Sequence, residues 1–119
     1  MSETERAVVR SRGNAEHYTW GEGCDGWHLL KSDALSVIEE RVPPGKSESR
    51  HFHSHAQQCF YVVAGEAVIE LAGQEFVLCA GESLVVPALA PHQFFNRSVS
   101  DVRFLVISQP AMRGDRQAA

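Results

Sequence analysis

Short runs of valine, isoleucine, leucine and aromatic residues recur along most of the chain, separated by glycine, proline, asparagine and aspartate about every ten residues. This rhythm is typical of an all-β sandwich or barrel. Glycine-containing segments at residues 64–66, 72–73 and 80–82 separate consecutive runs and predict tight hairpins. We therefore expect strands at residues 16–20, 27–31, 35–42, 50–53, 58–63, 67–71, 74–78, 83–86, 92–96 and 102–108.

The length and polarity of the chain indicate one barrel domain with polar ends. A chain of 119 residues divided in two would leave each half too little buried surface to be stable. The polar residues 1–13 predict a flexible N-terminal arm, residues 14–109 a barrel, and residues 110–119 a C-terminal tail. The pattern contains no long amphipathic helix and no internal repeat.

Composition and charge restrict the partners and the compartment. The formal charge of -4 and pI near 5.8, with basic residues scattered rather than clustered, argue against nucleic acid as a partner. No apolar run approaches the roughly 20 residues that cross a bilayer, and the N-terminus lacks the pattern of a secretory signal. Cys24, Cys59 and Cys79 form no CxxC pair. We expect a cytoplasmic protein with reduced thiols and no membrane partner.

Histidines gather in the stretch of residues 45–65. His51 and His53 are two residues apart on an expected strand, so their side chains leave from the same face. Gln58 begins the next strand on the face predicted to be interior, and His92 begins a later strand. A single strand histidine is more often a packed or surface residue than a ligand. Several imidazoles buried together, however, repel one another when protonated, and a shared metal ion removes that cost.

Two motifs in this sequence resemble the paired motifs of the cupin superfamily. The first motif is glycine, five residues, His-x-His, four residues, an acidic position, six residues and glycine, and it is carried here by Gly45, His51, His53, Gln58 and Gly65. The second motif is carried by Gly81, Pro87, His92 and Asn96, with Leu89 where a glycine is usual. The resemblance implies a cupin barrel, which is a double-stranded β-helix or jelly roll of two antiparallel sheets, and a homodimer.

The resemblance also implies a metal site formed by His51, His53, Gln58 and His92. Gln58 stands where the family usually has a glutamate ligand; its amide oxygen can coordinate a metal but brings no negative charge. Imidazole ligands favour Zn²⁺, Ni²⁺, Fe²⁺, Cu²⁺ or Mn²⁺ over Mg²⁺ or Ca²⁺. His55 continues the alternation of His51 and His53 and is the alternative fourth ligand; the other interpretation places it on a solvated turn.

Open coordination positions on such an ion suit an enzyme that binds a small oxygenated organic molecule. The fold does not select among the dioxygenases, isomerases, cyclases and lyases of the family. Our first hypothesis is a metal-dependent dioxygenase, isomerase or cyclase, and the second is a non-catalytic cupin that binds or senses a small molecule. Two features stay open. The segment 20–27 either covers the barrel mouth or places its tryptophans in the end of the barrel or in a subunit contact. Glu39 and Glu40 are adjacent and point to opposite faces, so only one could be internal and act as a general base; the other interpretation places both at the surface.

Overall fold

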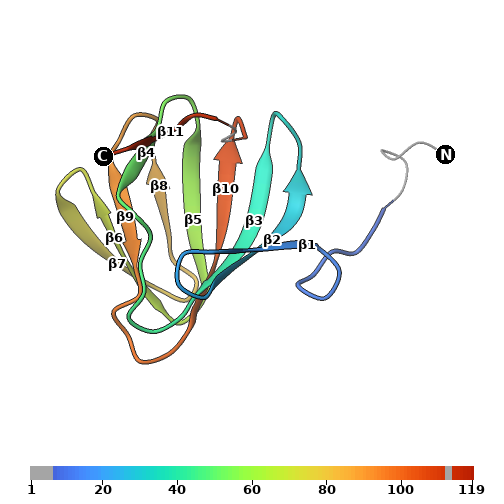
Figure 1. Ribbon diagram of the computed structural model, residues 1–119, viewed down its shortest axis with the longest axis horizontal. Helices are drawn as coiled ribbons and strands as arrows, with labels where there is room; N and C mark the ends of the chain where they lie inside the picture. The colour runs from blue at the N-terminus through green and yellow to red at the C-terminus, as the bar shows by residue number, and fades with distance from the viewer. Residues whose placement is uncertain (1–6, 112–113) are drawn as a thin grey trace.

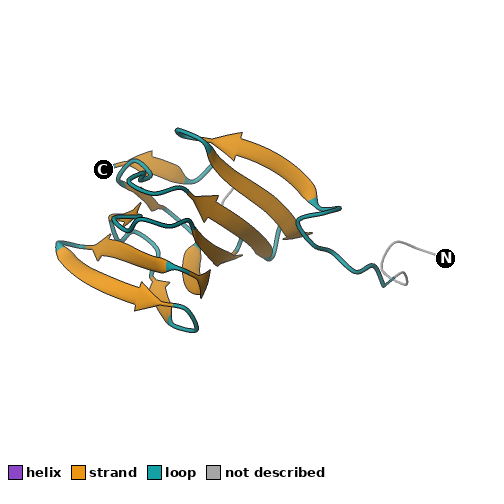
Figure 2. Ribbon diagram, turned by 90° about the horizontal axis from the view of Figure 1, so that it is seen from below, coloured by secondary structure: helices purple, strands orange, loops and turns teal. Residues whose placement is uncertain are grey.

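The computed structural model shows two antiparallel sheets packed face to face (Figures 1 and 2) and describes residues 7–111 and 114–119. These residues contain no helix, and hence none long and apolar enough to cross a membrane. The strands are β1 (Glu16–Trp20), β2 (Cys24–Lys31), β3 (Ser36–Val42), β4 (His51–His53), β5 (Gln57–Ala64), β6 (Glu66–Leu71), β7 (Gln74–Cys79), β8 (Ser83–Val86), β9 (His92–Phe95), β10 (Val102–Gln109) and β11 (Arg116–Ala118).

The sheet topology brings distant parts of the chain together. One sheet has six strands in the order β1-β2-β3-β10-β5-β8, and the other has five in the order β11-β4-β9-β6-β7. Every strand pairing is antiparallel. The jelly-roll barrel expected from the motifs is therefore confirmed, and β4 and β9, which carry the three motif histidines, lie side by side.

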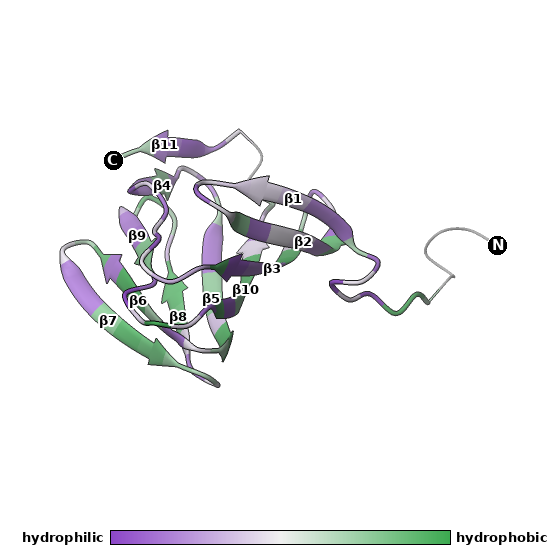
Figure 3. Cartoon of the chain, turned by 60° about the horizontal axis from the view of Figure 1, so that its bottom comes forward, coloured by the Kyte–Doolittle hydropathy of each residue, from purple (hydrophilic) through white to green (hydrophobic). Residues whose placement is uncertain are grey.

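The core lies between the sheets because buried and exposed residues alternate along the strands, as in β10. Phe60, Phe94 and Phe104 stack at its centre, with ring centroids 4.1 to 6.1 Å apart. Such aromatic pairs contribute about 0.5–1.5 kcal/mol beyond their buried area. Figure 3 shows a largely hydrophobic β8 and a more polar β1–β2 hairpin. The core ends at His92, whose ring centroid is 6.0 Å from that of Phe60.

The expected strands match the structure to within a few residues, with one omission. The sequence pattern placed the start of β2 at residue 27, whereas β2 begins at Cys24, so the segment 20–27 is mostly a hairpin rather than a loop. β11 lies within the tail expected at residues 110–119, where no strand was predicted. It joins the sheet by backbone pairing with β4, which needs no hydrophobic periodicity. Part of the expected arm, residues 1–6, lies outside the described residues.

Two turns show what the motifs require of the backbone. Gly65 has a φ of 89°, and a Cβ there would meet the carbonyl oxygen of Asp101 at 2.5 Å, so only glycine fits between β5 and β6. Leu89 also takes a left-handed φ, 71°, at the position where the cupin motif usually has glycine. Its backbone nitrogen donates to the carbonyl of His53 at 2.7 Å, which ties this turn to β4 beside the histidine cluster.

Candidate metal centre

The structure brings His51, His53 and His92 together at one end of the core. His51 and His53 project from the same face of β4, and His92 on β9 is the direct cross-strand partner of His51. All three side chains are buried, and one ligand atom from each lies within 4.8 Å of those of the others. These residues form the cluster in the described chain that could hold a metal ion.

Each of the three imidazoles is fixed through its Nδ1 atom. Nδ1 lies 2.8 Å from the carbonyl oxygen of Ser49 in His51, 2.8 Å from Asp115 Oδ1 in His53, and 3.0 Å from the carbonyl oxygen of Ala90 in His92. Carbonyl oxygens and carboxylates accept hydrogen bonds, so we assign the proton to Nδ1 in each ring and the lone pair to Nε2. Metal-bound histidines usually donate such a hydrogen bond from the ring nitrogen that does not bind the metal.

The Nε2 atom of His92 supplies a direct test of the fit. It is buried and has no hydrogen-bond partner among the described residues. A buried polar atom without a partner costs about 1–3 kcal/mol, and coordination to a metal ion removes that cost. Burial also lowers the pKa of His92, and lowers that of His51 to about 4, so the rings are neutral near pH 7, as ligands must be. The donor set fits a divalent transition-metal ion.

Arg116 also lies close to His51 Nδ1, and its position has to agree with a proton on that nitrogen. Arg116 Nη2 lies 3.2 Å from His51 Nδ1, and it donates to Ser49 Oγ at 2.9 Å. If Nδ1 accepted a hydrogen bond from Arg116, its lone pair would face the Ser49 carbonyl lone pairs at 2.8 Å. The shorter carbonyl contact therefore decides the tautomer, and Arg116 lies beside the ring as a neighbouring charge.

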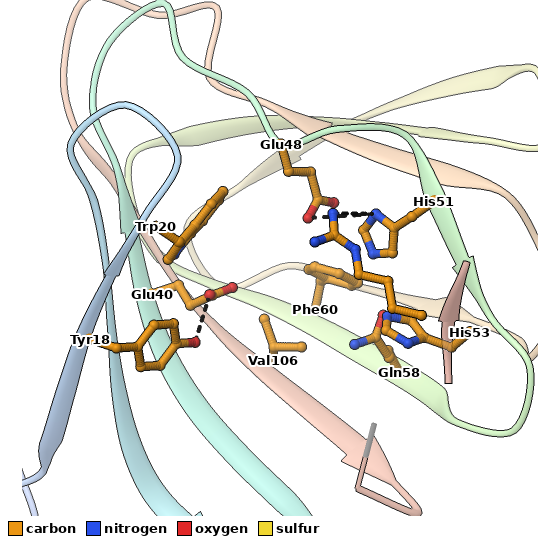
Figure 4. A pocket seen from close by; sticks show the side chains of 10 residues that line it. Tyr18, Trp20, Glu40, Glu48, His51, His53, Gln58, Phe60 and Val106 are labelled. Carbon is orange, nitrogen blue, oxygen red and sulfur yellow. Dashed lines mark hydrogen bonds and ion pairs between the residues drawn. The ribbon is translucent and has the colours of Figure 1, made fainter. Parts of the chain in front are cut away.

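Gln58 and His55, the two candidates for the fourth ligand, lie in different surroundings. Gln58 projects from β5 in the opposite sheet, is buried, and lines the same cavity as His51 and His53 (Figure 4). Its amide nitrogen donates to Ser108 Oγ at 3.1 Å, so coordination by this side chain would use the oxygen. His55 is exposed on the turn after β4 and is not in the histidine cluster.

The wall of the cavity opposite the histidines carries a carboxyl hydrogen-bonded to a tyrosine, Glu40 and Tyr18. The cavity has a volume of about 200 Å³, and Tyr18, Trp20, Glu40 and Glu48 line it (Figure 4). The Tyr18 hydroxyl donates to Glu40 Oε2 at 3.0 Å. Burial raises the pKa of Glu40 to about 7 and raises that of Tyr18 as well. Of the adjacent glutamates, Glu40 is therefore the inward one, whereas Glu39 forms ion pairs with Arg12 and Arg103.

Tyr18 reaches Glu40 because its partner across the hairpin has no side chain. Tyr18 pairs with Gly26 in the β1–β2 register, and a Cβ at Gly26 would overlap the Tyr18 ring. Trp20, two residues further along β1, also lines the cavity. The segment 20–27 thus supplies one residue of the cavity wall, Trp20, whereas its other tryptophan, Trp27, packs against His17 with ring centroids 5.3 Å apart.

Glu48 is a second buried carboxyl in the cavity. Burial, with a further contribution from the charge of Glu40, raises its pKa to about 8. Its Oε1 accepts from the backbone nitrogen of Phe94 at 3.1 Å, and its Oε2 lies 4.0 Å from His51 Nδ1. The cavity therefore contains two carboxyls with raised pKa values, Glu48 beside His51 and Glu40 on the opposite wall.

Asp115, directly before β11, and Arg116, the first residue of β11, are site residues that sequence reasoning missed. Burial alone would raise the pKa of Asp115, but hydrogen bonds from Ala56 N, the His53 ring and His55 N lower it below the ordinary value. Asp115 is 62 positions from His53 in the sequence. Their only sequence signal is an acidic and a basic residue after Gly114, which does not distinguish them from surface residues.

Comparisons with known proteins agree with this architecture. A family model described as Cupin domain matches residues 38–108, from β3 into β10. The chain belongs to the cupin family. Among curated relatives of this cupin, the polyketide synthase CurC of Streptomyces cyaneus is 31% identical over 67 residues, which cover 56% of the chain and 44% of CurC. The chain thus matches less than half the length of that relative.

Two solved structures share the fold of this cupin. KdgF from Halomonas sp. superposes with a TM-score of 0.82 at 18% identity, covering 91% of this chain and 97% of KdgF. The polyketide cyclase RemF from Streptomyces resistomycificus superposes with a TM-score of 0.81 at 21% identity, covering 96% of this chain and 86% of RemF. At such identities the likeness shows the fold alone, so the chemistry has to be argued from the cavity.

Proposed function

We propose that this cupin binds one divalent transition-metal ion through Nε2 of His51, His53 and His92, with Gln58 as the fourth ligand. We propose further that it catalyses proton transfer on a small oxygenated organic molecule, in an isomerisation, a cyclisation or an elimination. The observation that carries the proposal is the cluster of three imidazoles, each held through Nδ1, with the buried Nε2 of His92 lacking a partner.

The chemistry divides between the two sides of the cavity. A bound ion would act as a Lewis acid that polarises a carbonyl or hydroxyl oxygen of the substrate. Glu40, whose pKa is raised to about 7, can take up or release a proton near neutral pH. The Tyr18 hydroxyl donates to Glu40 Oε2 and so fixes the orientation of this carboxyl. Phe60 and Val106 supply apolar wall between the two groups and limit the access of water.

Proton-transfer chemistry is favoured over oxygenation because the cavity contains a positioned acid–base pair. An oxygenase needs open coordination positions but no titrating group held near pH 7, whereas an isomerase or cyclase needs one. The name of one protein of similar fold, the polyketide cyclase RemF, agrees with a cyclisation. A dioxygenase and a non-catalytic binding protein are the alternatives that the experiment separates.

The first measurement is the metal content of protein purified without chelator or nickel resin. Elemental analysis should find about one transition-metal ion per chain. The second measurement incubates the loaded protein in D₂O with a panel of enolisable ketones and hydroxy ketones and follows deuterium incorporation by NMR. The wild type should exchange protons on at least one compound, and Glu40→Gln should lose exchange with its metal content unchanged.

The matched control is Glu39→Gln, which removes the neighbouring carboxylate from the outer face of the same strand and should leave exchange unchanged. Failure to retain zinc, iron or manganese after soaking would contradict the metal site. Equal exchange by wild type and Glu40→Gln would contradict the acid–base role. Oxygen consumption without exchange would assign the protein to the dioxygenases, and metal uptake with ligand binding but no turnover would make it a binding module.

We also propose that the protein is a cytoplasmic homodimer. Its three cysteines are free thiols, which suits a reducing compartment. Val85 on the edge strand β8 is 57% exposed, and Tyr61 and Val63 on neighbouring β5 are also exposed. Apolar side chains beside an edge strand are suited to contact with a second subunit. Light scattering should give twice the mass of one chain, and Val85→Lys should shift it toward the monomer.

A further inference from the structure

Arg116 projects into the cavity from the last strand of the five-stranded sheet. β11 pairs antiparallel with β4 so that Arg116 lies opposite His53 and Ala118 lies opposite His51. Residues directly opposite in an antiparallel pair have their side chains on the same face of the sheet, so Arg116 shares the inner face with the two histidines. Its guanidinium lines the cavity and lies 3.2 Å from the His51 ring.

The guanidinium is held in place but not neutralised. Arg116 Nη2 donates to Ser49 Oγ at 2.9 Å and lies 3.4 Å from the Ser49 carbonyl oxygen. Within the described ranges 7–111 and 114–119, no carboxylate oxygen lies within 4.0 Å of it, whereas Arg41, Arg50 and Arg97 each have such a partner. Arg116 is also the one lysine or arginine that lines the cavity in those ranges. One positive charge beside the metal centre thus has no direct ion pair, and it acts on Glu40 and Glu48 only through space, where it lowers the pKa of each carboxyl.

We infer that Arg116 binds a carboxylate group of the substrate, so that the proposed reaction acts on a small carboxylic acid. This inference rests on the proposed function, because it names the substrate class of the same site. A guanidinium matches a carboxylate with two parallel N–H···O hydrogen bonds, which orient the ligand as well as hold it. Anchored there, a molecule of a few carbon atoms would extend along the cavity between the histidines and Glu40.

A carboxylate is favoured over a phosphate by charge and size. One guanidinium balances one negative charge, and a phosphate dianion would leave a second charge facing the carboxyls of Glu40 and Glu48. The cavity of about 200 Å³ is smaller than the roughly 300–1,000 Å³ of pockets for drug-sized ligands. A short carboxylic acid therefore fits both the single cation and the space.

The test measures binding of butyrate, its uncharged amide butyramide and inorganic phosphate by calorimetry, in zinc-loaded and in chelator-stripped protein. We expect butyrate to bind the wild type more tightly than either other probe. Arg116→Gln should weaken butyrate binding at least about tenfold, in line with loss of a charge-assisted hydrogen-bond pair. Arg116→Lys, which keeps the charge but not the planar fork, should show an intermediate loss.

The matched control is Arg97→Gln, which removes the same charge from an exposed ion pair with Glu75 and should leave butyrate binding unchanged. Zinc content and thermal unfolding of Arg116→Gln report whether β11 stays in place. Equal butyrate affinity in wild type and Arg116→Gln, or tighter binding of phosphate or butyramide, would overturn the inference. If the wild type retains no zinc but stripped protein still shows the Arg116 dependence, the metal proposal fails and the carboxylate anchor stands.

Discussion

The two walls of the cavity are held in place in different ways. The histidine wall consists of His51, His53 and His92 on β4 and β9, and two of its three rings are fixed by carbonyl groups only two residues away. The acid wall consists of Tyr18 and Glu40, and its hydrogen bond joins residues 22 positions apart on β1 and β3. The first wall is therefore oriented largely by local backbone, and the second by tertiary packing.

Because the two walls are held differently, we expect metal binding and proton transfer to be affected by different substitutions. Local carbonyl acceptors fix the tautomers of His51 and His92, and they remain in place if the opposite sheet shifts. The acid wall requires the close approach of Tyr18 to Gly26 and burial of Glu40 between the sheets. We expect changes in the histidine wall to remove metal with the barrel folded, and changes in the acid wall to alter proton chemistry with the metal retained.

The largest effect is expected from a substitution that removes one histidine ligand and leaves the acid wall intact. In His92→Ala the ion would lose one of three imidazole ligands, and its affinity should fall by more than the about 10–100-fold typical for loss of an outer partner. Elemental analysis after dialysis measures the loss, and circular dichroism reports the barrel. His17→Ala, which removes an exposed histidine paired with Asp25, is the control and should leave metal content unchanged. Equal metal content in both variants would contradict the site.

The next largest effect is expected at Asp115, which is distant in sequence from His53 and accepts a hydrogen bond from its ring. Asp115→Asn keeps the size of the side chain but removes the charge that accepts from His53 Nδ1. Metal affinity should fall about 10–100-fold, because the carboxylate raises the basicity of the ligating ring. Competition with a chromogenic chelator measures the affinity. Asp101→Asn, which alters a half-exposed carboxylate paired with Arg41, should have no effect; a similar loss there would show that the effect is not specific to His53.

The fold and the histidine wall could both be predicted from the sequence because both depend on local patterns along single strands. Alternating burial along β5 and β10 is a local pattern, and so is the spacing of His51 and His53 on one strand face. The acid wall was predictable only in part. Adjacency showed that at most one of Glu39 and Glu40 could face inward, but no local pattern identified that one does, which one it is, or that Tyr18 would reach it.

The contribution of β11 could not be predicted from the sequence. Asp115 and Arg116 act through the antiparallel register of β11 with β4, and register is a property of the assembled sheet. Polar residues near a chain end carry no periodicity that distinguishes a paired strand from a solvated tail. Residues that complete a site from across a sheet are therefore the ones that motif spacing omits.

A smaller effect on metal affinity is expected at Gln58, which faces the histidine wall from the opposite sheet. Gln58→Glu places a carboxylate at the cavity position contributed by β5, facing the histidine wall from the opposite sheet. The added negative charge should tighten metal binding about tenfold, or by about 1.4 kcal/mol. The same chelator competition measures it, with Gln57→Glu as the exposed neighbouring control. Unchanged or weaker binding in Gln58→Glu would indicate that this side chain does not reach the ion.

The smallest expected effect tests the acid wall through stability in chelator-treated protein. Burial raises the pKa of Glu40 from 4.5 to about 7. The titratable and charged groups that act on or contact it are Tyr18, Cys24, Glu48 and Arg116. Between these two pKa values the unfolded chain has released the proton and the folded chain still holds it. The wild type should therefore lose stability as the pH rises through this window, with the full cost present above pH 7.

Glu40→Gln has no proton to release at this position, so it should become progressively more stable than the wild type between pH 5 and pH 8. The change in the difference of unfolding free energies should be on the order of 1 kcal/mol, less than the full pKa shift implies because Glu40 keeps some exposure to solvent. Urea unfolding followed by tryptophan fluorescence measures it, with Glu39→Gln as the outward-facing control. A difference that stays flat with pH would mean that Glu40 ionises like a surface carboxyl, and the acid wall would then lack the proton that the proposed chemistry requires.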